Sequence, residues 1–158
     1  MKSQILAQRF DDVIFNGKHI AGTNYHAFLQ EIDYETATSQ ALHVNSIAHL
    51  TRHVHYYING VAYALQTGHL KIRDAYSFDF APLQQEIEWN HVKSEFFKDA
   101  TTLSQLIKGT NEFKLSLPFI NEKYGSLEHN INMMVEHCYY HLGQMILLSK
   151  IHTSSSTN

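Results

Sequence analysis

The sequence predicts an all-α protein with the architecture of a four-helix bundle, on the strength of three observations. Apolar residues recur at steps of three and four in four separate segments, which is the period of an amphipathic helix. There are no internal repeats and no alternating pattern of strands and helices. The length of 158 residues suits one ordinary domain with its own core. We therefore expect a single domain over residues 1–152 and a flexible polar tail, TSSSTN, over residues 153–158.

The first helix is expected to be broken. The stretch SQILAQRFDDVIF at residues 3–15 has helical spacing, Asn16-Gly17 interrupts it, and NYHAFLQEI at residues 24–32 resumes it. Glycine lowers helix stability, so a kink or a break is expected here rather than a strand.

The second helix follows Ser46, a plausible N-cap, and stops at Gly68. Its apolar stripe has steps of three and four and consists of Ile47, Leu50, Val54, Ile58, Val61 and Leu65. Residues 69–83 lose this period, which predicts a loop that packs over one end of the fold. A third helix is expected from residue 84 to residue 107, with a stripe formed by Ile87, Val92, Phe96, Ala100, Leu103 and Ile107.

The last helix is expected from Ser126, its N-cap, to about Lys150. Its stripe is formed by Leu127, Ile131, Met134, Cys138, His141 or Leu142, Met145 and Leu148. Residues 111–126 connect it to the third helix, and the alternation of Phe113, Leu115 and Leu117 predicts a short extended stretch before Pro118.

Composition excludes several classes of function. The net charge is −3 without a basic stripe, so a nucleic acid is not an expected partner. No apolar run is long enough to cross a membrane, and MKSQILAQRF lacks the apolar core of a signal peptide. A single cysteine, Cys138, agrees with a reducing compartment and falls in an apolar stripe, which favours a buried structural thiol over a ligand or a nucleophile. We expect a soluble cytoplasmic protein.

Histidine is the unusual residue, because the chain has twelve, as many as lysine and arginine together. His137 and His141 are four apart on a predicted helix, which places both on one face, about 40° and about 6 Å from each other. Two imidazoles can bind one metal ion, but a tight site needs a third ligand. His53 borders the apolar stripe of the second helix and can supply it.

Alternatives to this ligand set remain open from spacing alone. His49 shares the face of His53 one turn earlier, whereas His55 lies about 200° away and should point elsewhere. Histidines that merely border a core would show the same spacing. Gln144 follows His141 by three residues and is a candidate to orient a ligand, or else an exposed side chain. Tyr57, four after His53, is a second candidate neighbour of an ion.

Two stretches, SIAHLTRHVHYYINGV and EHCYYHLGQMILL, together resemble the DinB-like (DinB/YfiT) superfamily, and IRDAYSFDFAPLQQEIEW is similar to one branch of it. The resemblance covers nearly the whole chain. It implies a four-helix bundle of up-down-down-up topology, often a dimer, in which three histidines bind a divalent ion such as nickel or zinc. The positions that match are His53, His137 and His141, with His49 as a rival to the first.

Relatives in this superfamily include metal-dependent enzymes that use low-molecular-weight thiols, such as thiol S-transferases and a mycothiol-dependent isomerase. The resemblance therefore implies a thiol-dependent S-transferase acting on small electrophiles. The alternatives are a metal-dependent hydrolase of a small substrate, a non-enzymatic metal-binding stress-response module, and a purely structural protein. The sequence offers no general base, since Glu136 lies about 100° from His137 around the helix. Tyr63, Phe96 and Phe97 either form a homodimer interface or belong to the core.

Overall fold

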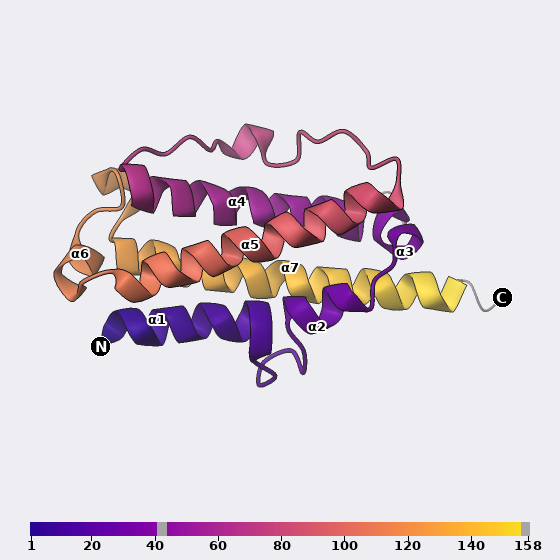
Figure 1. Cartoon of the computed structure of the whole chain (residues 1–158), viewed down its shortest axis with the longest axis horizontal. Coiled ribbons are helices and arrows are strands. Elements are labelled where there is room, and N and C mark those ends of the chain that lie inside the picture. The colour runs from indigo at the N-terminus through magenta and orange to yellow at the C-terminus, as the bar shows by residue number, and fades with distance from the viewer. Residues whose placement is uncertain (41–43, 156–158) are drawn as a thin grey trace.

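A computed structural model describes residues 1–40 and 44–155, and in this part of the chain the secondary-structure elements are helices, without a β-strand (Figure 1). The all-α prediction is therefore confirmed. Four long helices lie along the longest axis of the molecule: α1 (Lys2–Asp11), α4 (Ile47–Thr67), α5 (Glu86–Gly109) and α7 (Leu127–Ser155).

The four long helices form a closed ring of contacts, in which each helix packs against two of the others. Helix α4 packs against α5 and α7, and α1 packs against the same two helices. In Figure 1, α1 and α7 run from left to right, whereas α4 and α5 run from right to left. Because α4 and α5 are consecutive and point the same way, the chain between them has to return along the whole molecule. This return places residues 69–83 along the flank of α4, so the prediction that they cover one end of the fold is wrong.

The predicted break in the first helix is confirmed. Helix α1 continues into a π-helical turn (Asp12–Asn16), and the chain then leaves the helix at Gly17. The Gly17 N–H donates to the Asp12 carbonyl, and a Cβ at Gly17 would lie 2.5 Å from that oxygen, so only glycine fits. Two short helices follow, α2 (Tyr25–Gln30) and α3 (Tyr34–Thr38).

The ends of the later helices follow local capping chemistry. The Ser46 hydroxyl accepts the His49 N–H at the start of α4, and Gly68 ends this helix in the left-handed conformation, as predicted. Ser126 caps α7 by accepting the His129 N–H. Helix α7 extends to Ser155, so residues 153–155 belong to a helix rather than to the expected tail, whereas residues 156–158 lie outside the described part.

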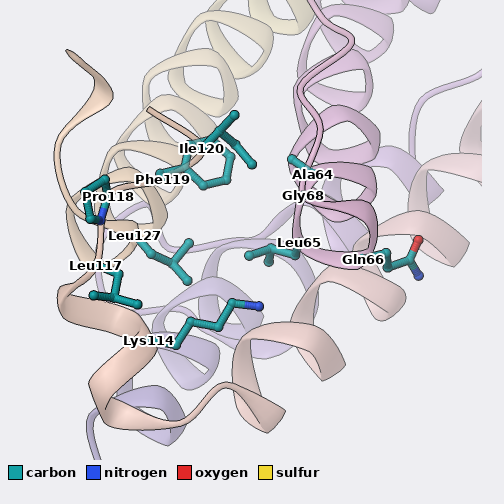
Figure 2. Close-up of a pocket in the computed structure, with 10 residues that line it drawn as sticks. All are labelled: Ala64, Leu65, Gln66, Gly68, Lys114, Leu117, Pro118, Phe119, Ile120 and Leu127. Carbon is teal, nitrogen blue, oxygen red and sulfur yellow. The ribbon is translucent and has the colours of Figure 1, made fainter. Parts of the chain in front are cut away.

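The connector before α7 differs from its prediction. Asn111 accepts the Lys114 N–H at 2.7 Å and so starts a short helix, α6 (Glu112–Ser116), where an extended stretch was expected. The side chain of Leu115 is buried, whereas that of Phe113 is 74% exposed. Between this connector and the end of α4 lies an apolar hollow of about 360 Å³, shown in Figure 2. It lies about 16 Å along α4 from His53 and is separate from the histidines.

The core between the helices contains large aromatic side chains that are fully buried. Tyr25 stacks on Phe96 at 5.2 Å between ring centres and donates its hydroxyl to the Cys138 carbonyl. The Trp89 indole N–H donates to the Ile32 carbonyl at 3.0 Å. Cys138 is itself buried, which raises the pKa of its thiol and agrees with the structural role expected of it. Phe96 is therefore a core residue and not part of an exposed dimer face.

Replacing Phe96 by alanine should remove this stacked pair and lower the free energy of unfolding by about 3–5 kcal/mol. The measurement is urea unfolding followed by circular dichroism. The matched control is Phe113→Ala, whose ring is 74% exposed and should change stability by less than about 0.5 kcal/mol. If the two variants lowered the free energy of unfolding by the same amount, the assignment of Phe96 to the core would be contradicted.

Candidate metal centre

Three histidines from two helices meet at one point between α4 and α7. His53 comes from the second turn of α4, and His137 and His141 come from successive turns of α7. One ring nitrogen from each residue lies within 4.8 Å of the other two. His53 and His141 are buried at 6% exposure each, and His137 is half-buried. These are the three histidines that the sequence predicts, and the fold brings them together.

The spacing of the nitrogens suits a single ion. The Nε2 atoms of His53 and His137 are 3.1 Å apart. Two imidazoles that bind one zinc ion tetrahedrally at about 2.0–2.1 Å have nitrogens about 3.3 Å apart. The ring centre of His141 lies 4.7 Å from that of His53 and 4.5 Å from that of His137. The three rings meet edge to face, so their nitrogens converge without stacking.

Two of the three imidazoles are oriented by carbonyl oxygens. His53 Nδ1 lies 3.1 Å from the Ser77 backbone oxygen, and His141 Nδ1 lies 2.7 Å from Gln144 Oε1. A carbonyl oxygen only accepts hydrogen bonds, so both Nδ1 atoms carry the proton and both Nε2 atoms present a lone pair. This is the arrangement that fixes metal-binding histidines in other proteins. Gln144 thus contacts His141, as expected of a residue that orients a ligand.

Aromatic rings enclose the triad. Tyr57 meets His53 and His137 edge-on, with ring centres 5.1 and 5.0 Å away. Phe78 stacks on His53 at 4.0 Å, and the more exposed Tyr140 packs against His141 at 4.9 Å. Such packing limits the rotamers of the imidazoles and reduces the access of water.

The other histidines of α4 point elsewhere. His49 Nδ1 lies 3.1 Å from the Ser46 hydroxyl at the start of the helix. His55 faces α5, where its Nε2 lies 2.8 Å from an Asp99 carboxylate oxygen. The geometry therefore places His53, and not His49, opposite the pair on α7.

Burial keeps the triad uncharged. It lowers the pKa of His53, His137 and His141 below the ordinary value of 6.5, and for His137 to about 4. The second cause at His137 is the positive charge that His141 and His53 would carry. Neutral imidazole is the form that binds a metal ion, so the site is ready for one at neutral pH.

An acidic side chain that the sequence did not point to lies beside the triad. The charge of Asp74 acts on both His53 and His137 and opposes the lowering of their pKa values. Its Oδ1 accepts the Tyr57 hydroxyl at 2.7 Å. Burial, followed by this hydrogen bond, raises the pKa of Tyr57 to about 12. Tyr57 is therefore a hydrogen-bond donor at every pH at which the protein would work.

Comparison with known proteins gives no match: no protein-family model, no curated protein and no solved structure matches the chain. None of the described helices is both long and apolar enough to cross a membrane. The function of the site is therefore inferred from its own chemistry.

The lowered pKa of His137 predicts how the metal-free protein responds to acid. Between pH 6.5 and about 4, the unfolded chain binds a proton at this histidine and the folded chain does not. The free energy of unfolding should therefore fall as the pH is lowered through this window. Urea unfolding at several pH values measures the slope, which His137→Gln should reduce and His129→Gln, on an exposed part of α7, should not. A slope unchanged by His137→Gln would contradict the burial of this imidazole.

Proposed function

We propose that this protein is a divalent-metal-dependent enzyme of the DinB-like superfamily, a four-helix bundle of up-down-down-up topology in which His53, His137 and His141 hold nickel or zinc. The observation that carries the proposal is the convergence of three imidazole nitrogens within 4.8 Å of one another. The carbonyl partners of His53 and His141 support it, because they turn both Nε2 lone pairs toward the same point. The two sequence motifs that resemble the superfamily contain all three histidines.

Three neutral ligands suit catalysis rather than a closed structural site. A divalent ion held by three imidazoles keeps a coordination position open and lowers the pKa of a thiol or water bound there. The chain supplies the orientation: Gln144 and the Ser77 carbonyl fix two rings, and Tyr57 and Phe78 pack against them. The exposed ring of Tyr140 packs against the buried ring of His141.

The reaction that we propose is thiol S-transfer. A low-molecular-weight thiol loses its proton to the surrounding water, and its sulfur forms a bond to an electrophilic carbon of a small substrate. The bond between that carbon and the leaving group breaks, and the leaving group departs with its electron pair. The buried Cys138 is not the nucleophile, because burial raises the pKa of its thiol. The attacking sulfur therefore comes from a separate molecule. The proposal places the enzyme in the cytoplasm, as a homodimer, with no nucleic-acid or membrane partner.

Metal content tests the ligand set. Untagged protein should contain about one equivalent of nickel or zinc, measured by elemental analysis after exposure to each ion and removal of the excess. His53→Ala and His141→Ala should lose the metal, because two imidazoles are seldom enough for tight binding. His49→Ala is the matched control on the same helix and should keep it. A parent protein that takes up neither ion would contradict the proposal.

The reaction is tested by incubating the metal-loaded protein with a small haloalkane or epoxide and a set of cellular thiols. Consumption of the electrophile should require both the metal and a thiol, and His141→Ala should abolish it. Consumption without any thiol would instead indicate a hydrolase. Metal binding without consumption under either condition would indicate a binding module and refute the S-transferase.

A further inference from the structure

The chain between α4 and α5 approaches the metal centre through one tight turn. Residues Asp74–Tyr76 form a 3-10 helix, and Ser77 closes it, since both the N–H and the hydroxyl of Ser77 donate to the Asp74 carbonyl at 3.0 and 2.8 Å. Ser77 is buried at 4% exposure. The direction of the Ser77 carbonyl is therefore tied to the position of Asp74.

This turn is attached to α4 at two points. Its first residue, Asp74, accepts the Tyr57 hydroxyl at 2.7 Å, and the backbone carbonyl of its last residue, Ser77, accepts the Nδ1–H of the His53 ring at 3.1 Å. His53 and Tyr57 are themselves one turn apart on α4, and their rings are in contact. The contacts thus form a closed ring that runs from Tyr57 to Asp74, through the turn to Ser77, and back to His53.

We propose that Tyr57 and Asp74 are positioning residues of the metal centre, which hold the 74–77 turn so that the Ser77 carbonyl keeps the His53 Nε2 lone pair directed at the ion. The inference rests on the proposed metal site and adds two residues that touch neither the metal nor a substrate. No substitution can remove a backbone carbonyl, but the Tyr57–Asp74 hydrogen bond joins the turn to α4 through two side chains, so substitutions there can change the direction of the Ser77 carbonyl.

Other contacts keep the loop on α4 when this bond is absent. The Tyr56 hydroxyl donates to the Arg73 carbonyl at 3.2 Å and accepts the Arg73 N–H at 3.0 Å. Arg52 donates to the Ala81 carbonyl at 2.6 Å, and Gly60 leaves room for the Ile72 side chain against the helix. Loss of the Tyr57–Asp74 bond should therefore loosen the turn and the Ser77 carbonyl without releasing the loop.

The test is zinc affinity, measured by competition with a chromophoric chelator. Partners that orient metal ligands typically contribute about 10–100-fold to metal affinity. We expect Tyr57→Phe and Asp74→Ala each to weaken zinc binding about tenfold, and the double variant to lose no more than either single variant, because both remove the same bond. Asp74→Asn keeps an oxygen that can accept the Tyr57 hydroxyl and should bind zinc as the parent does.

The matched control is Tyr34→Phe, which removes a hydroxyl bonded to the Leu83 carbonyl, near the far end of the same loop. It should leave zinc affinity unchanged. A second measurement does not depend on the metal: long-range ¹H–¹⁵N spectra of the histidine side chains should show the Nδ1-protonated form of His53 in the parent and a mixture of both forms in Tyr57→Phe.

Three other outcomes would overturn the inference, and each would indicate a different cause. If Tyr57→Phe and Asp74→Ala bind zinc as tightly as the parent protein does, the turn keeps its place without the bond. An Asp74→Asn variant as weak as Asp74→Ala would show that the carboxylate acts through its charge. A parent protein that binds no zinc would refute the metal site and the positioning role together, whereas the first two results leave the metal site intact.

Discussion

The contact between His53 on α4 and the two histidines of α7 is the constraint on which the rest of the site depends. A buried imidazole has two ring nitrogens, and a polar group without a partner is costly inside a protein. His53 and His141 meet this requirement in the same way, with one nitrogen bonded to a carbonyl oxygen and the other facing the triad. The result is a set of lone pairs that converge between the helices.

The topology supplies the partner that His53 needs. Helices α4 and α5 run in the same direction, so their connection has to travel back along α4. That path brings Ser77 and Phe78 over His53, one as a hydrogen-bond acceptor and one as a stacked ring. Two faces of helix α7 have different roles. Cys138 and Leu142 pack in the core, whereas His137 and His141 face the site.

The sequence predicted features that are set locally. The limits of α4 follow from a serine cap and a left-handed glycine, and the pairing of His137 with His141 follows from the helical repeat alone. The position of His53 around the axis of α4, beside the apolar stripe, predicted that this histidine borders the core. The short helices α3 and α6 were missed because five residues are too few for a period to be read.

Features set by tertiary contacts escaped prediction. Asp74 lies 17 residues after its partner Tyr57, and Ser77 lies 24 residues after its partner His53. The sequence of a loop does not reveal which helix the loop packs against. The wrong placement of residues 69–83 and the missed carboxylate beside the triad thus have one cause. Phe96 shows the same difficulty, since an aromatic residue on an amphipathic helix suits an interface as well as a core until the packing is known.

X-ray absorption at the zinc edge of the metal-loaded protein tests the central claim most directly, because it reports the ligands of the ion itself. We predict a first shell at about 2.0–2.1 Å with the outer-shell scattering of three imidazole rings. His53→Ala should reduce the imidazole scattering of any zinc that remains bound. A first shell of oxygen atoms with one imidazole or none would contradict the account, because the ion would then lie outside the site formed by His53, His137 and His141.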